Sequence, residues 1–184
     1  MATEYAGGRN SFDELPTAPE LLRAFHTPAE RPVRPHAVLE AAHALVGCHE
    51  RRHRAVTTAH TRCIDSDRLA HCTRTVGAID AERAKLVAEI DIWVAETIPH
   101  RTGATLHTET LGAVIDRLAA KWVAAQDALG LLSTSGESGP HPRDGHRDVD
   151  LEAHLHWVRL AELTDGYKDL ITDVAARRRR LPVF

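Results

Sequence analysis

The feature of this sequence that most constrains its fold is a series of apolar residues at alternating spacings of three and four. The longest series runs from Leu69 to Thr97. This spacing places the side chains along one stripe of a helix and is typical of left-handed helical bundles. Similar stripes indicate four long helices, at about residues 36–62, 67–98, 108–130 and 149–180. Because most of the connections are short, the sequence predicts an all-α protein, an antiparallel four-helix bundle with long helices.

Residues that favour helix ends mark the limits of these segments. Asp65, Ser66 and Asp67 supply cap-type residues for the second long helix, and either Thr108 or Thr110 is expected to cap the third. Pro99 is expected to end the second helix, and Gly130 stands where a glycine commonly follows a helix.

The chain is predicted to have two parts. Residues 1–35 form an N-terminal arm that is flexible at its start and carries a short extra helix from Pro16 to His26. Residues 36–184 form the bundle domain. Its segment 131–148 is rich in glycine, serine, proline and histidine, which predicts a flexible loop.

Composition narrows the range of partners and compartments. Of the 184 residues 43% are hydrophobic but only 4% aromatic, which favours helices packed through small aliphatic side chains. A net charge of −3 gives no general attraction to nucleic acid or to an anionic membrane. The sequence shows neither a membrane span nor a signal peptide, and its three cysteines form no CxxC pair. We therefore expect a cytoplasmic protein with reduced thiols.

Two polar residues interrupt the apolar stripes. Arg83 occupies a core position in the second helix and His156 occupies one in the fourth. Pairing the helices across their turns puts residues 45–50 beside residues 79–83, with His156 at about the same level. A buried Arg83 needs an anionic partner. The alternative is that Arg83 extends to solvent while His156 lies at a loose edge of the bundle.

Acidic residues of the second and third helices fall at matching levels. Asp80 and Asp91 are three helical turns apart and share one flank of the second helix. Asp91 lies level with Asp116 and Arg117 of the third helix. We therefore expect a polar cluster along the bundle interior or in one groove.

A metal site is an alternative. Residues 49–53 read HERRH, which matches the zinc-binding pattern H-E-x-x-H with His49 and His53 as ligands and Glu50 as general base. The E-x-x-H steps at Glu40 and Glu50 are also found in di-iron bundles, but those proteins need the steps on two different helices. We expect no cofactor, with zinc or di-iron as the alternative.

Two segments carry a family resemblance. Residues 80–91 read DAERAKLVAEID and residues 107–118 read HTETLGAVIDRL. Together they resemble the bacterial family called domain of unknown function 4254, over about residues 40–125. That family shows Asn-x-x-Arg…Ile-Asp and then Asn-Thr-Glu-(Thr/Ser)-Pro-Gly-x-x-Ile-Asp-Arg-Leu. The chain departs from the family pattern at His43, Gly47, Arg51, Asp80 and Leu111. The resemblance implies an all-helical bacterial protein and brings no activity with it. It points to Glu50, Arg54, Arg83, Asp91, Glu109, Asp116 and Arg117.

These observations support three functional hypotheses. The first is an enzyme or binding protein for a small anionic or polyhydroxylated metabolite, in bacterial surface-sugar or specialised metabolism. Its expected catalytic residues are Glu50, Asp91 and Asp116. Its expected ligand-binding residues are Arg54, Asp80, Arg83, Glu109, Arg117 and His156. The second is a structural or protein-interaction module, a helix-bundle oligomer whose charges form interhelical ion pairs. The third is a metal-dependent enzyme that uses His49, Glu50 and His53.

Overall fold

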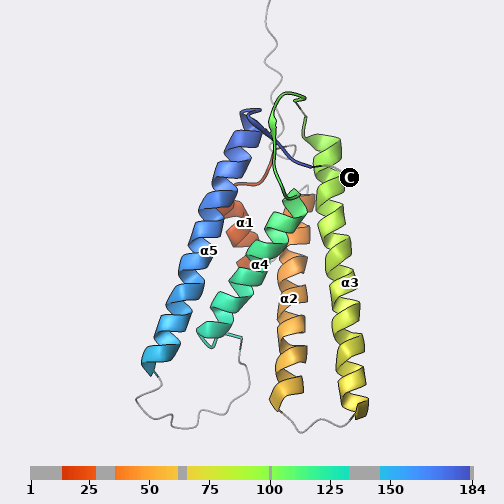
Figure 1. Ribbon diagram of the computed structural model, residues 1–184, viewed down its shortest axis with the longest axis vertical. Helices are drawn as coiled ribbons and strands as arrows, with labels where there is room; N and C mark the ends of the chain where they lie inside the picture. The colour runs from red at the N-terminus through yellow and green to blue at the C-terminus, as the bar shows by residue number, and fades with distance from the viewer. Residues whose placement is uncertain (1–13, 28–35, 62–65, 100, 133–145, 183–184) are drawn as a thin grey trace, which may run out of the picture.

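The structure is a computed structural model that describes residues 14–27, 36–61, 66–99, 101–132 and 146–182. The described chain is mostly helical, which confirms the predicted all-α class. Its helices are α1 (Ala18–His26), α2 (Ala37–Thr61), α3 (Ser66–Thr97), α4 (Leu111–Ala128) and α5 (His146–Ala175) (Figure 1). Residues 1–13 and 28–35 of the arm and residues 133–145 of the segment predicted to be a loop lie outside the described residues.

The helices pack around α4. The helices α2, α3 and α4 pack on one another, while α5 packs on α4 and α1. Consecutive long helices run in opposite directions (Figure 1). The short helix α1 also packs on α2. Because α4 contacts three other elements, its buried residues Leu111, Ile115 and Leu118 lie at the centre of the hydrophobic core. None of the helices within the described ranges is long and apolar enough to cross a membrane.

Local signals account for the start of α1 and for both ends of α4. The backbone N–H and the hydroxyl of Thr17 both donate to the Glu20 carboxylate at the start of α1, 2.8 and 2.7 Å away. Helix α4 starts at Leu111 with Thr110 as its N-cap, one of the two predicted caps. Gly130 follows the end of α4 with a φ of 71°, which confirms its predicted place, because glycine adopts this conformation without a steric cost.

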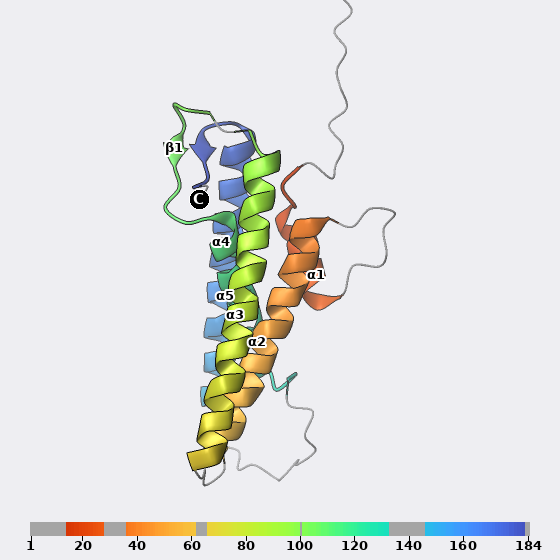
Figure 2. The same cartoon turned by 90° about the vertical axis from the view of Figure 1, so that its right-hand side faces the viewer.

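The C-terminal segment corrects one prediction. The fourth long helix was expected to reach Arg180, but α5 ends at Ala175. Strand β2 (Arg179–Arg180) then pairs in parallel with strand β1 (Thr105–Leu106). This small sheet lies at the end of the molecule where α3 and α5 finish (Figure 2). The apolar stripe did not predict that α5 ends at Ala175. A helix can end at a residue that favours helices when the residues after it pair with another part of the chain.

Candidate functional site

Asp116 joins three helices through one oxygen atom. The Nε2–H group of His49, on α2, donates to Oδ1 of Asp116, on α4, over 2.8 Å. The Nε atom of Arg83, on α3, lies 3.2 Å from the same oxygen. The Asp116 and His49 side chains are 20% and 13% exposed. Charge-assisted contacts in such partly desolvated surroundings are stronger than the same contacts in open water.

A second carboxylate extends the contacts toward the surface. Nη1 of Arg83 donates to Oδ1 of Asp80 over 2.8 Å, and Nε of Arg52 donates to the same oxygen over 3.2 Å. We call the five residues the Asp116 network: His49, Arg52, Asp80, Arg83 and Asp116. Arg83, which interrupts the apolar stripe of its helix, therefore contacts two carboxylates. The Arg52–Asp80 contact joins α2 and α3 two residues beyond the stretch 45–50 that was predicted to lie beside residues 79–83.

The network depends on a close approach of α3 and α4 one turn away. A Cβ atom on Gly112 would lie 2.5 Å from the carbonyl oxygen of Val87 and 2.9 Å from Oδ1 of Asp91. Only glycine allows the two helices to lie this close. Because α3 and α4 run in opposite directions, Asp116, four residues after Gly112, meets Arg83, four residues before Val87.

Asp91 acts at this junction and does not join the network. Its Oδ1 accepts the backbone N–H of Gly112 over 2.8 Å at the start of α4. The Thr110 hydroxyl accepts the N–H of Ala113 over 3.2 Å and also bonds to Asp91. Burial raises the pKa of Asp91, and the bonds from Gly112 and Thr110 oppose that rise. The expected catalytic residue Asp91 thus has a clear role in joining two helices.

Four other predicted site residues pair with one another. Arg117 makes a bidentate pair with Glu109, at 2.8 and 2.7 Å. Arg54 donates to Glu50 one turn away on α2, over 3.0 Å. Both pairs are substantially exposed, and exposed ion pairs contribute little to stability. The structure does not bring these four residues into the Asp116 network.

His156 also lies apart from the network. It is half-buried on α5, and α5 packs on α4 and α1 rather than on α2 or α3. The predicted common level with Arg83 therefore does not place the two side chains together, because a level along the bundle axis does not specify which helices are neighbours.

The H-E-x-x-H residues have three separate partners. His49 binds Asp116, Glu50 binds Arg54, and Nε2 of His53 lies 3.0 Å from Oδ1 of Asp127. Within the described ranges, no group of three or more His, Cys, Asp and Glu side chains is placed to hold a metal ion. The geometry of these residues therefore does not favour the zinc or di-iron alternative.

Sequence reasoning missed two members of the network. Arg52 was not singled out, and His49 was considered only as a metal ligand. The i, i+3 spacing of His49 and Arg52 places both on one face of α2, at the level that was predicted to meet residues 79–83. That spacing was the available signal.

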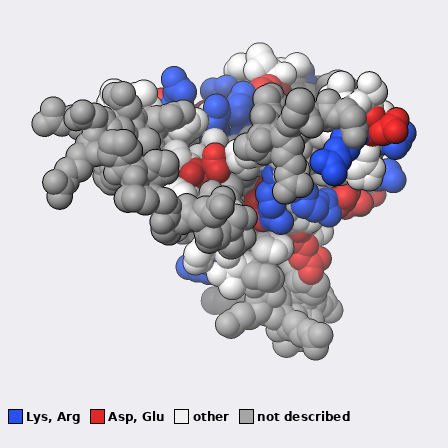
Figure 3. All heavy atoms as spheres, turned by 90° about the horizontal axis from the view of Figure 1, so that it is seen from below, with Lys and Arg blue, Asp and Glu red and all other residues white. Residues whose placement is uncertain are grey.

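Basic and acidic groups are mixed on the surface. Viewed along the long axis from the end where α2 leads into α3, Lys and Arg side chains are interspersed with Asp and Glu side chains on the described part of the face (Figure 3). This mixture agrees with the small net charge of −3. The described part of this face is therefore not the single-sign surface that is typical of nucleic-acid binding.

The fold and the network define a class: a helical protein in which three packed helices share a polar network that reaches the surface. The chain belongs to the DUF4254 family of proteins of unknown function, whose family model matches residues 39–183. Comparison with curated proteins and with solved structures gave no match. The part of the family pattern at residues 110–112 has a structural explanation here, because Thr110 and Gly112 build the junction of α3 and α4.

Proposed function

We propose that this protein binds a small polyhydroxylated metabolite with an anionic group at the Asp116 network. One observation carries the proposal. Every hydrogen bond that Asp80 and Asp116 receive from described residues ends on Oδ1. The Oδ2 atom of each carboxylate is therefore left to accept hydrogen bonds from other molecules, while Oδ1 holds the carboxylate in place.

Each network residue has a chemical role in this proposal. The Oδ2 atoms of Asp80 and Asp116 accept hydroxyl protons of the ligand. The guanidinium groups of Arg52 and Arg83 contact its anionic group. The side chains of Arg52, Asp80 and Arg83 are each exposed by about a third or more, so a ligand can reach them from solvent. The Asp116 side chain is less exposed.

The same site offers acid–base chemistry. A carboxylate that accepts one imidazole N–H fixes the orientation of the ring and leaves the other ring nitrogen for proton transfer. His49 and Asp116 have this relation, over 2.8 Å. In the proposal, this pair replaces Glu50 and Asp91 as the candidate for a proton-transfer step, because those two residues bind Arg54 and Gly112.

A thermal-shift screen with sugar phosphates and nucleotide sugars tests the proposal. We expect one of these ligands to raise the melting temperature of the wild-type protein, and Arg83→Ala to remove that rise. Arg117→Ala is the matched control, since Arg117 is also an ion-paired arginine but lies outside the network. Isothermal titration of both variants should agree. If Arg83→Ala keeps the full shift, or Arg117→Ala loses it equally, the site is assigned wrongly.

A structural role is the second candidate, and a specific observation favours it. Both guanidinium groups of the network already have a carboxylate partner within it. In this proposal, α2 to α5 form an antiparallel four-helix bundle, and the network fixes the register of α2, α3 and α4, as interhelical ion pairs do in coiled coils. Asp116→Asn would then lower the melting temperature while no ligand of the screen shifts the wild-type protein.

A further inference from the structure

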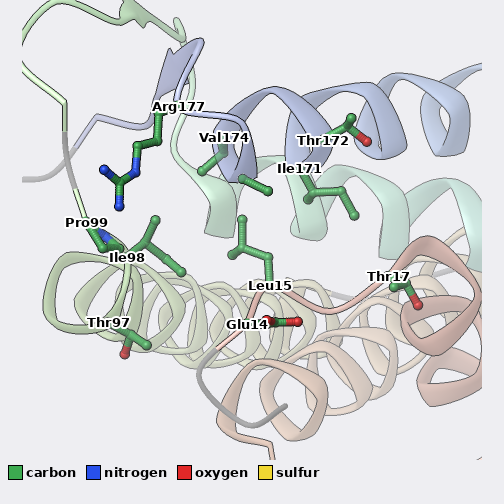
Figure 4. Close-up of a pocket in the computed structure, with 11 residues that line it drawn as sticks. Glu14, Leu15, Thr17, Thr97, Ile98, Pro99, Ile171, Thr172, Val174 and Arg177 are labelled. Carbon is green, nitrogen blue, oxygen red and sulfur yellow. The ribbon is translucent and has the colours of Figure 1, made fainter. Parts of the chain in front are cut away.

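A pocket separate from the Asp116 network lies where three elements meet. It has a volume of about 380 Å³ and is bounded by the segment before α1, the end of α3 and the end of α5. Its apolar wall includes Leu15, Ile98, Ile171 and Val174 (Figure 4). This volume falls within the range of small-molecule sites.

Two hydrogen bonds hold the wall that the N-terminal segment contributes. The hydroxyl of Tyr167 donates to the carbonyl oxygen of Pro16 over 2.7 Å, from a side chain that is 1% exposed. On the other side of Leu15, Nε2 of His36 lies 3.0 Å from the carbonyl oxygen of Glu14. Because the backbone is fixed on both sides of Leu15, the pocket is formed before any ligand binds.

One end of the pocket is basic. Arg177 lines both this pocket and an adjoining one, which is also lined by Pro99, Arg101 and Thr102. Figure 4 shows the Arg177 side chain reaching from the end of α5 toward Pro99. In the described part of the chain, no carboxylate forms an ion pair with the guanidinium group of Arg101 or Arg177. Glu14 also lines the pocket, and it is exposed.

The backbone of Arg177 adopts a conformation that favours glycine. Its φ is 57°, and it is the non-glycine residue with a positive φ in the described ranges. The N–H of Arg178 bonds to the carbonyl of Asp173, and that of Arg177 to the carbonyl of Val174, each over 2.9 Å. This is the Schellman arrangement, in which the residue at the position of Arg177 is usually glycine.

The neighbouring arginines have a structural explanation that Arg177 lacks. Arg178 and Arg179 both pair with Asp173, at 2.8 and 3.4 Å. Arg177 has no such carboxylate partner among the described residues, although its backbone conformation is unfavourable for a residue with a side chain. Unfavourable backbone conformations are concentrated at functional sites. Arg177 has such a conformation, and it lines the pocket.

From these observations we propose that this pocket binds an amphipathic anion, with its aliphatic chain against Leu15, Ile98, Ile171 and Val174. The carboxylate or phosphate head lies at the basic end, where Arg177 and Arg101 contact it. A guanidinium group binds either head through paired hydrogen bonds. The site is independent of the Asp116 network, so the two proposals succeed or fail separately.

Titration of the full-length protein with octanoate, below the concentration at which it forms micelles, tests the proposal. We expect saturable binding of octanoate or of octyl phosphate, and the tighter of the two identifies the head group. Octanol, which lacks the charge, and acetate, which lacks the chain, should each bind at least about tenfold more weakly. Equal affinity for octanol or acetate, or no saturable binding of either anion, would overturn the proposal.

Arg177→Gly separates the role of the side chain from that of the backbone. Because glycine suits this backbone, the variant should melt about 2 °C higher than the wild type without ligand. It should also bind the anion at least about tenfold more weakly. Arg178→Ala, which changes the adjacent arginine outside the pocket, should keep the wild-type affinity. An Arg177→Gly variant with full affinity would refute the assignment, as would an Arg178→Ala variant with the same loss.

Discussion

Replacing Gly112 by alanine tests the junction on which the Asp116 network depends. The added Cβ atom would lie 2.5 Å from the carbonyl oxygen of Val87, a backbone atom that cannot rotate away. Helices α3 and α4 would have to separate by about 0.9 Å for this pair to reach 3.4 Å, where ordinary contact begins. The same movement lengthens the 2.8 Å bond from Gly112 to Asp91 beyond hydrogen-bond range.

The cost follows from three contributions. Overpacking at a tight contact costs about 1 to 3 kcal/mol. Loss of a hydrogen bond to a charged acceptor costs about 1.5 to 3 kcal/mol. The better helix propensity of alanine returns about 1 kcal/mol. The net loss in the free energy of unfolding is therefore about 3 kcal/mol, which lowers the melting temperature of a chain this size by roughly 6 to 12 °C.

Thermal and urea unfolding, followed by circular dichroism, measure this loss. Gly47→Ala is the matched control, since a Cβ atom on Gly47 within α2 meets nothing within 4 Å. That variant should gain about 1 kcal/mol from helix propensity alone. If Gly112→Ala melts at the wild-type temperature while Gly47→Ala behaves as expected, the close approach of α3 and α4 is wrong.

Three further predictions concern hydrogen-bonded groups. Tyr167→Phe should lower the free energy of unfolding by about 1 to 2 kcal/mol in urea titrations, because the carbonyl of Pro16 loses its buried donor. An unchanged midpoint would contradict this. Arg178 and Arg179 hold the pKa of Asp173 below its usual 3.8. Asp173→Asn should therefore be less stable than the wild type above pH 3.8, and the difference should disappear as the pH falls through the lowered pKa. Burial raises the pKa of Asp91, because the charged carboxylate is less stable than the neutral acid in its partly buried position. The wild type should therefore lose stability relative to Asp91→Asn as the pH rises from 3.8 through the raised pKa. Melting curves of both proteins between about pH 3 and 7 measure this change. A difference in melting temperature that stays constant over this range would refute the prediction.

The helices could be predicted because their signals are local. Apolar residues three and four apart fall on one face of a helix wherever that helix lies in the protein. The Thr110 cap and the Gly130 stop act within one turn of their own positions. The same argument explains the failure at the end of α5. That helix stops at Ala175, where pairing of β2 with a strand more than 70 residues earlier competes with helix formation.

The candidate site was predicted in part. Asp80, Arg83 and Asp116 meet, but the sequence placed Asp116 level with Asp91, which instead lies beside Gly112, one turn earlier on α4. Arg117, which the sequence also placed level with Asp91, pairs with Glu109 instead. A level along a helix is set by the number of residues, but the partner of a side chain depends on the rotation of the helix and on which neighbours it has.

The sequence by itself determined the helical class, most helix ends and the family of this protein, because those properties depend on residues close together in the chain. Only the tertiary structure decided that Gly112 brings α3 against α4, that α5 carries His156 away from the network, and that Arg177 faces a pocket. These outcomes depend on contacts between helices whose residues are far apart in the chain, and the free energy of such contacts arises only when the helices pack.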